Sequence, residues 1–325
     1  MRILKIISWN ILLIFLLFLV AEYAIRILKP HIRTTCTSKN ILIDSLYYSS
    51  TGLIKNSTDN CKNVIKSVNT ISCWAYKNSY KIGEKILYLG DSVTMGIGVE
   101  NDSTFAGRIN NDLKNVSIIN PSLIGYSHKD YLNLVKHFII DKQNSLQIGE
   151  VDIFWCLNDV YSELPDSNSP ENTFGHFINE IANFFRRNSK LYYFLKKNFS
   201  DRPKAYFLYD NQFYNLTNPN YKKAIESLRI INTILSKMNI DFNVILLPFE
   251  FELRDGFDAT NSPQSLLVQS LSSIGIRVYD LLPLIREKHI PSEDLYLYGD
   301  GIHFSCKGHK LIADIMSKNI YVQQH

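Results

Sequence analysis

Two segments far apart in the sequence carry residues that together can perform nucleophilic catalysis. Gly90-Asp91-Ser92 follows a short apolar run, and Asp300 and His303 stand three positions apart near the C-terminus. A serine hydroxyl becomes a nucleophile when a histidine accepts its proton, and a carboxylate fixes the tautomer of that histidine. The pattern predicts acyl transfer at Ser92, with His303 as general base and Asp300 orienting it. The alternatives are a serine that only caps a helix and a histidine in a solvated loop.

Two more residues are candidates for stabilising the negative charge that acyl transfer develops. Gly125 follows a second apolar run, and Asn158 follows a third. A glycine lets the backbone approach a ligand closely, so its N–H can donate, and an amide side chain can donate to an oxyanion. The alternatives are an ordinary turn glycine and an asparagine that closes a turn.

The sequence argues against nucleotide, nucleic-acid and metal binding. The glycines at 90, 96 and 98 lack the spacing of a dinucleotide-binding loop, and no Gly-Lys-Ser/Thr follows them. The G-x-S-x-G elbow of α/β-hydrolases is absent around Ser92. A net charge of +4 without a dense basic run disfavours nucleic acid, and no Cys/His spacing resembles a zinc site. We therefore expect no metal and no organic cofactor.

Short apolar runs alternate with amphipathic stretches from residue 82 onward. The runs that we predict as strands are 85–89, 116–120, 151–157, 243–247 and 276–281. Apolar residues recur at helical spacing from Phe105, Tyr131, Tyr221 and Leu311. Strands alternating with helices imply a doubly wound parallel sheet covered on both faces. Because such folds bind ligands beyond the carboxyl ends of their strands, the candidate residues should meet at one rim.

The order of these residues resembles the SGNH hydrolase superfamily, whose members are also called GDSL esterases. That family carries Ser, Gly, Asn and His in four blocks, matched here by Ser92, Gly125, Asn158 and His303. The resemblance covers roughly residues 83–318. It implies an α/β fold of three α/β/α layers around a doubly wound, mostly parallel five-stranded sheet of flavodoxin-like type.

The resemblance also implies the roles of the reacting residues. It makes Ser92 the nucleophile, His303 the general base and Asp300 the residue that orients His303. Asp91 would help to fix the serine loop. The expected reaction is that of a carboxylic ester hydrolase or an O-acyltransferase.

By the same resemblance, three donors form the oxyanion hole: the Ser92 N–H, the Gly125 N–H and the Asn158 amide. One departure from the family pattern concerns Cys156, which stands where the third block usually begins with glycine. Its side chain either narrows the pocket or merely packs, so the geometry around Asn158 remains open at this point.

The N-terminus contains a candidate membrane segment. Residues 6–21 form an uncharged run rich in Leu, Ile and Phe, preceded by Arg2 and Lys5. We expect an uncleaved, single-pass signal anchor, because no small-x-small cleavage site follows; a cleaved signal peptide is the alternative. The short N-terminal tail favours an extracytoplasmic catalytic domain, periplasmic or at the cell surface, although basic residues also follow the run.

The chain divides into three expected regions. These are a transmembrane anchor at 1–29, a linker or small cap at 30–81, and a hydrolase domain at 82–325. An aromatic-rich insertion at about 161–241 interrupts the alternation of strands and helices. Its rings either shape a substrate site by stacking on sugars or pack locally.

The five cysteines are Cys36, Cys61, Cys73, Cys156 and Cys306. The first three lie close together and allow one disulfide, which suits an oxidising compartment. The alternative is five free thiols. The odd count leaves at least one thiol unpaired within the chain.

Three functions fit these features. The first is a serine esterase that removes acetyl or other short acyl groups from an envelope glycan or lipid. The second is an O-acetyltransferase that passes the same acyl group to a cell-surface polysaccharide. The third is a non-catalytic glycan-binding module, since a fold alone does not establish chemistry. The partners expected are therefore an ester-bearing glycan or lipid and the membrane, with no nucleic acid; the sequence indicates no protein partner.

Overall fold

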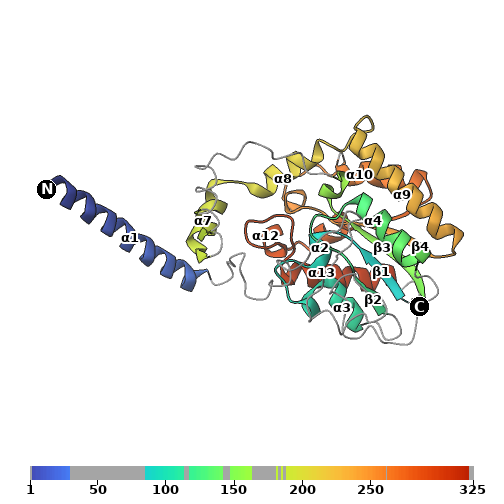
Figure 1. Cartoon of the computed structure of the whole chain (residues 1–325), viewed down its shortest axis with the longest axis horizontal. Coiled ribbons are helices and arrows are strands. Elements are labelled where there is room, and N and C mark those ends of the chain that lie inside the picture. The colour runs from blue at the N-terminus through green and yellow to red at the C-terminus, as the bar shows by residue number, and fades with distance from the viewer. Residues whose placement is uncertain are drawn as a thin grey trace. The chain divides into compact units, whose positions relative to one another are not determined.

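Five short apolar strands form one parallel sheet (Figure 1). The strands are β1 (Lys85–Leu89), β2 (Ser117–Ile119), β3 (Ile148–Trp155), β4 (Asp241–Leu246) and β5 (Arg277–Asp280). Their order is β2-β1-β3-β4-β5, and every neighbouring pair is parallel. The predicted five-stranded doubly wound sheet is thus confirmed. The chain reverses its direction of winding beside β1, which is where such folds place their ligands.

The computed structural model describes residues 2–29, 85–112, 117–141, 147–162, 181, 184–185, 188–260 and 262–321. These residues fall into two units. The larger unit contains the sheet and the helices around it. The smaller unit contains α1 (Arg2–Leu28) and α7 (Lys190–Phe199).

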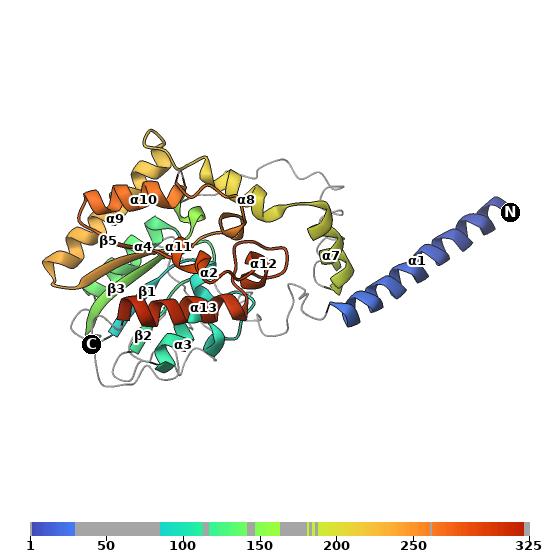
Figure 2. The same ribbon diagram turned by 180° about the vertical axis from the view of Figure 1, so that it is seen from behind.

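Helices cover both faces of the sheet (Figures 1 and 2). On one face, α3 (Phe105–Asp112) packs against α13 (Cys306–Met316). On the other, α4 (His128–Val135) packs against α9 (Pro219–Lys237), and α10 (Pro263–Ser273) packs on β5. Right-handed crossovers require this division, because α3 leads from β1 to β2 in one direction and α9 and α10 lead to β4 and β5 in the other.

Other helical elements lie between these in the sequence. They are α2 (Ser92–Met95), η3 (Asn101–Ser103), η4 (Lys136–Asp141), η5 (Leu157–Val160), α8 (Arg202–Asn211), η6 (Glu250–Leu253), α11 (Leu281–Arg286), α12 (Ser292–Leu295) and η7 (Ser317–Tyr321).

The core follows from the apolar strands that the sequence analysis identified. Leu87 of β1, Ile153 of β3 and Val244 of β4 are completely buried. Burying one such side chain contributes about 1.5–3 kcal/mol relative to leaving it in water. The central strands are therefore the rigid base from which the loops at their carboxyl ends project.

Between Lys5 and Glu22, the helix α1 is apolar on all sides. Its candidate span, Lys5–Leu28, has a mean hydropathy of 2.5, and none of that segment is buried within the protein. By length and composition it is a candidate membrane span or signal segment, as expected.

Some boundaries differ from the expectation. The strand β3 begins three residues earlier than predicted and ends at Trp155, because Cys156 and Leu157 already turn into η5. The predicted insertion at 161–241 includes α9, which is the crossover helix between β3 and β4. The proposed linker at 30–81, with Cys36, Cys61 and Cys73, lies outside the described residues. The three-region division itself stays a prediction.

Candidate active site

The loop after β1 presents Ser92 at the start of a helix. Asp91 is the N-cap of α2, and Ser92 is its first residue. Gly90 is required between strand and helix, because a Cβ atom there would lie 2.0 Å from Thr94 Oγ1. The first N–H groups of a helix have no intrahelical acceptor, so the Ser92 N–H is available to a ligand.

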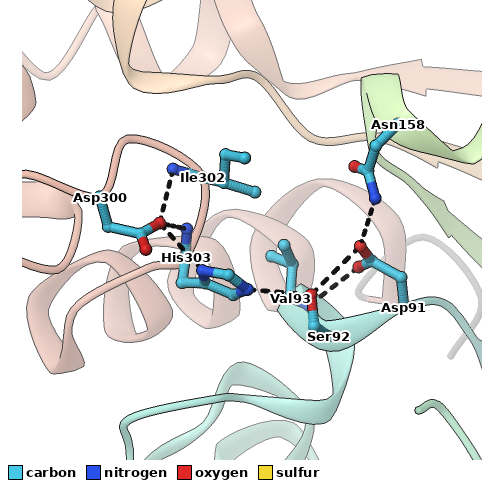
Figure 3. A network of polar contacts seen from close by, with 7 residues as sticks. All are labelled: Asp91, Ser92, Val93, Asn158, Asp300, Ile302 and His303. Atoms are coloured by element: carbon cyan, nitrogen blue, oxygen red, sulfur yellow. Dashed lines mark hydrogen bonds and ion pairs between the residues drawn. The ribbon is translucent and has the colours of Figure 1, made fainter. Parts of the chain in front are cut away.

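Ser92, His303 and Asp300 form a continuous chain of polar contacts (Figure 3). Ser92 Oγ lies 2.9 Å from His303 Nε2, and His303 Nδ1 lies 2.9 Å from Asp300 Oδ1. With the Nδ1 proton donated to Asp300, the lone pair of Nε2 faces the serine hydroxyl. Ser92 and the Asp300–His303 pair, which are more than 200 positions apart in the sequence, thus have the arrangement in which a serine is activated.

The Asp300 carboxylate also shapes the loop that carries the histidine. Its Oδ1 atom accepts hydrogen bonds from the backbone N–H groups of Ile302, at 3.0 Å, and His303, at 2.8 Å. Burial by itself would raise the pKa of Asp300, but the charge of protonated His303 and these hydrogen bonds outweigh it and lower the pKa to about 2. The carboxylate is therefore ionised throughout the neutral range.

Asn158 joins the serine loop through Asp91 (Figure 3). Asn158 Nδ2 donates to Asp91 Oδ2 at 2.9 Å, and Asp91 Oδ1 accepts from the Val93 N–H at 2.8 Å. Ser92 Oγ also lies 3.3 Å from Asp91 Oδ2, farther than it lies from His303. An amide nitrogen carries two hydrogens, so the bond to Asp91 leaves one for a ligand.

Gly125 lies in the turn after β2, at the same edge of the sheet. Its φ of +79° is the left-handed conformation that favours glycine. Asn120 Nδ2, five residues earlier, donates to Thr94 O at 3.1 Å and so ties this segment to α2. Among the described residues no hydrogen bond joins Gly125 to Ser92, and its role as an oxyanion donor stays a prediction.

Cys156, the departure from the family pattern, is a packing residue. Its side chain is only 1% exposed, and its N–H donates to Asp159 Oδ2 at 2.9 Å. Burial raises the pKa of the Cys156 thiol well above its usual range, and the nearby Asp91 carboxylate raises it further. The thiol is therefore neutral and packs beside Asp91.

One residue that holds this site in place was not predicted from the sequence. Tyr214 OH donates to Leu157 O at 2.8 Å and accepts from Trp155 Nε1 at 2.9 Å, which fixes the backbone next to Asn158. In the sequence, only its position in the aromatic-rich segment could have pointed to this role. This ring belongs to the core, as the local-packing interpretation of that segment expects.

His309 has a structural role on α13. Its ring is 1% exposed, and Nδ1 accepts from the Phe105 N–H at 3.2 Å. Burial, followed by the charges of Arg108 and His303, lowers the pKa of His309 to about 3. A neutral histidine in this position links α13 to α3 behind the reacting residues.

Metal ligation has no candidate in the described part of the chain. Within those residues, no group of three or more His, Cys, Asp or Glu side chains is arranged to hold a metal ion.

One comparison with known proteins identifies a family. The family model described as GDSL-like lipase/acylhydrolase matches residues 86–316. No curated protein matches the sequence.

The solved structures to which this chain is similar include the following three. A lipolytic G-D-S-L protein from Veillonella parvula is 12% identical, with 74% of this chain and 99% of that chain covered and a TM-score of 0.44. The lipase/acylhydrolase from Enterococcus faecalis is 18% identical, with coverages of 74% and 96% and a TM-score of 0.42. The esterase EstA from a Pseudoalteromonas species is 14% identical, with coverages of 74% and 98% and a TM-score of 0.43.

The matched region begins in β1, ends in α13 and contains every candidate residue of the site. The chain therefore belongs to the family of GDSL-like lipases and acylhydrolases, the SGNH hydrolases.

Proposed function

We propose that this protein is a serine ester hydrolase that works through an acyl intermediate on Ser92. The observation that carries the proposal is the 2.9 Å approach of Ser92 Oγ to His303 Nε2, with Asp300 held on the far side of the ring. A hydroxyl within hydrogen-bond reach of a base that is itself oriented by a carboxylate is the requirement for this chemistry.

In the first half of the reaction, His303 Nε2 takes the proton from Ser92 Oγ as that oxygen bonds to the ester carbonyl carbon. His303 then gives the proton to the alcohol oxygen as the carbon–oxygen bond breaks and the alcohol leaves. Asp300 does not take up a proton, because its pKa of about 2 lies far below neutral pH. Its charge stabilises the imidazolium that forms between the two transfers.

In the second half, water replaces the alcohol. A water molecule gives a proton to His303 Nε2 and attacks the acyl carbonyl carbon. The bond to Ser92 Oγ then breaks, the proton returns to that oxygen, and the carboxylic acid is released.

Three donors would stabilise the oxyanion in both halves: the N–H groups of Ser92 and Gly125 and the free hydrogen of Asn158 Nδ2. The position of Ser92 at the start of α2 and the bond from Asn158 to Asp91 support this assignment. One such donor is commonly worth about 3–4 kcal/mol to the transition state.

For the substrate we propose an acetyl or other short acyl ester on an envelope glycan or lipid, with the catalytic domain outside the cytoplasm. The support is the apolar helix α1, which is a candidate membrane span. Transfer of the acyl group to a polysaccharide hydroxyl uses the same residues as hydrolysis. Hydrolase and O-acyltransferase therefore differ only in the acceptor.

The test compares the full chain in detergent with its Ser92→Ala variant, on p-nitrophenyl acetate and a longer-chain ester. Ser236→Ala, an exposed substitution on α9, is the matched control. The proposal predicts release of p-nitrophenol by the intact and control proteins and not by Ser92→Ala. Acetylated product in the presence of a glycan acceptor would assign the transferase activity instead. Equal inactivity of intact protein and Ser92→Ala on every ester would contradict both and favour a glycan-binding module.

A further inference from the structure

The C-terminal part of α1 binds the beginning of another helix of the same unit. Glu22 Oε1 accepts from the Lys190 N–H at 3.0 Å and from Arg26 Nε at 2.8 Å. Glu22 Oε2 accepts from Ser189 Oγ at 2.8 Å and from the Leu191 N–H at 2.9 Å. Each oxygen of this carboxylate thus has two donors.

These contacts supply hydrogen-bond acceptors for the first N–H groups of α7. A helix leaves its first four N–H groups without intrahelical acceptors. In α7, the N–H groups of Lys190 and Leu191 donate to Glu22, and that of Tyr192 donates to Ser189 Oγ at 3.0 Å. Glu22 therefore caps a helix that begins 168 positions later in the sequence.

Two further contacts extend the same interface. Arg26 Nη2 donates to Asn188 O at 2.7 Å. Phe18, one turn before Glu22, meets Phe185 edge to face with ring centroids 5.8 Å apart. The C-terminal end of α1 lies next to α7 in both views (Figures 1 and 2). The interface therefore runs from the polar end of α1 into its apolar part.

The position of Glu22 along α1 matches a membrane boundary. The 17 residues from Lys5 to Ala21 carry no charge after Lys5 and span roughly 25 Å as a helix. The hydrocarbon core of a bilayer is about 30 Å thick, so Glu22 and Arg26 would lie where the lipid becomes polar. A helix that is apolar on all sides needs lipid or protein around it, and none of this span is buried in the protein.

One face of α7 is apolar and exposed at this boundary. Tyr192, Leu195 and Phe199 recur at spacings of three and four, and Leu195 and Phe199 are 43% and 85% exposed. Lys196 lies over the Tyr192 ring, 5.6 Å from its centroid. Phe184, next to the ring that contacts α1, is 61% exposed. Apolar rings and leucine beside lysines are the composition of a helix that lies in a membrane interface.

We propose that α7 lies on the surface of the bilayer that α1 enters, held there by Glu22. The occupant of its exposed face is a phospholipid surface with anionic headgroups, because Lys196 borders that face beside Tyr192. The apolar surface of α1 continues onto α7 through Phe18 and Phe185, which is why we assign lipid rather than a protein partner. It also follows that α1 is a retained part of the mature protein. The proposal does not depend on the esterase activity.

Lipid contact is tested with the full chain in vesicles of phosphatidylcholine and phosphatidylglycerol. A single cysteine at Phe199→Cys carries an environment-sensitive fluorophore, with the native cysteines replaced. Lys197→Cys is the matched control, because two positions on a helix differ by about 200° around its axis. We expect the label at 199 to be blue-shifted and quenched several-fold more by a lipid-bound quencher than the label at 197. Equal quenching at both positions, with iodide reaching both, would overturn the lipid contact.

The contact between α1 and α7 at Glu22 is tested by a Phe18→Cys, Phe185→Cys pair in the same background. The account predicts an intramolecular cross-link that Glu22→Ala reduces several-fold. Glu226→Ala, which removes an exposed ion pair with Arg229 on α9, should leave its yield unchanged. Failure to cross-link in protein that still hydrolyses its ester would contradict the contact between α1 and α7. A mature chain that begins after Glu22 would contradict it as well. Neither result would bear on the proposed esterase mechanism.

Discussion

Asn158 Nδ2 donates to Asp91 Oδ2 across 2.9 Å, which connects the end of β3 to the loop after β1. Asp91 is completely buried and also accepts the Val93 N–H of the catalytic helix. One carboxylate therefore sets both the direction of the Asn158 amide and the start of α2. The nucleophile and its proposed oxyanion donor are positioned by the same side chain.

The first prediction concerns Asn158. Asn158→Ala should lower kcat roughly 100- to 1,000-fold, because one oxyanion donor is lost. Asn158→Asp should be at least as impaired, since it places an acceptor against the Asp91 carboxylate. KM should change little in both variants, because the lost interaction belongs to the transition state. A kcat within a few-fold of wild type in Asn158→Ala would remove Asn158 from the oxyanion hole.

The second prediction concerns Asp300. Asp300→Asn should lower kcat by up to about 10,000-fold, because the amide favours the tautomer in which Nε2 is protonated and cannot accept the serine proton. Steady-state kinetics on p-nitrophenyl acetate measure this change. A loss of less than ten-fold would indicate that His303 is oriented by something other than Asp300.

The same variant tests the pKa of Asp300. The folded-state pKa of about 2 lies below the usual 3.8, so the stability that this carboxylate contributes is present above pH 3.8 and is lost as the pH falls toward 2. The advantage of wild type over Asp300→Asn in unfolding midpoint should therefore persist as the pH falls from 7 to about 4 and shrink below it. Urea titrations at several acid pH values measure it; a difference that already shrinks between pH 7 and 5 would contradict the lowered pKa.

The third prediction compares two exposed glycines. Gly125 and Gly275 have φ values of +79° and +75°, and a Cβ at either would meet nothing within 4 Å. Gly125→Ala and Gly275→Ala should thus each cost about 1–2 kcal/mol of stability, the penalty of a left-handed alanine. Only Gly125→Ala should also lower kcat, because relaxing its backbone turns its N–H away from the proposed oxyanion. Equal activity in the two variants would contradict the role of Gly125.

The fourth prediction concerns stability away from the site. Glu252 is completely buried, and its Oε2 atom accepts from the Phe249 N–H and from Gln264 Nε2. Burial raises the pKa of Glu252 from 4.5 to about 8. The folded chain thus keeps a proton that the unfolded chain loses above pH 4.5, so this group's contribution to stability falls as the pH rises from 4.5 to 8.

Glu252→Gln removes this titration at nearly constant shape. The stability of wild type relative to the variant should decline across that window, by up to about 1.4 kcal/mol for each pH unit. Denaturant titrations of both proteins at pH 5, 6, 7 and 8 give the difference directly. A difference that does not change with pH would contradict the raised pKa.

Much of the architecture is predictable because it is locally encoded. The apolar runs at 85–89 and 243–247 are short and uninterrupted, and burial of such runs produces strands that end close to the predicted positions. Ser92 is recognisable because it closely follows the β1 strand, and His303 because Asp300 precedes it by three residues. The contact between them joins residues 211 positions apart, and the sequence predicted only that both would lie at one rim of the sheet.

The remaining relationships depend on contacts that no local pattern encodes. The Asn158–Asp91 bond requires β1 and β3 to be neighbours, which is a property of strand order. The burial of Cys156 and the bonds of Tyr214 depend on how α9 and η5 pack. In the sequence, Glu22 only marks the end of an apolar run. Its hydrogen bonds to the backbone N–H groups of α7 are seen only in the structure.

The central claim is a covalent acyl intermediate on Ser92. The most direct measurement is the intact mass of the protein after rapid acid quenching of a reaction with p-nitrophenyl acetate, followed by peptide mapping. The account predicts one added acetyl group on the peptide containing Ser92 in wild type, longer-lived in Asp300→Asn, and none in Ser92→Ala. Acetylation at another residue, or ester turnover by Ser92→Ala at the wild-type rate, would contradict it.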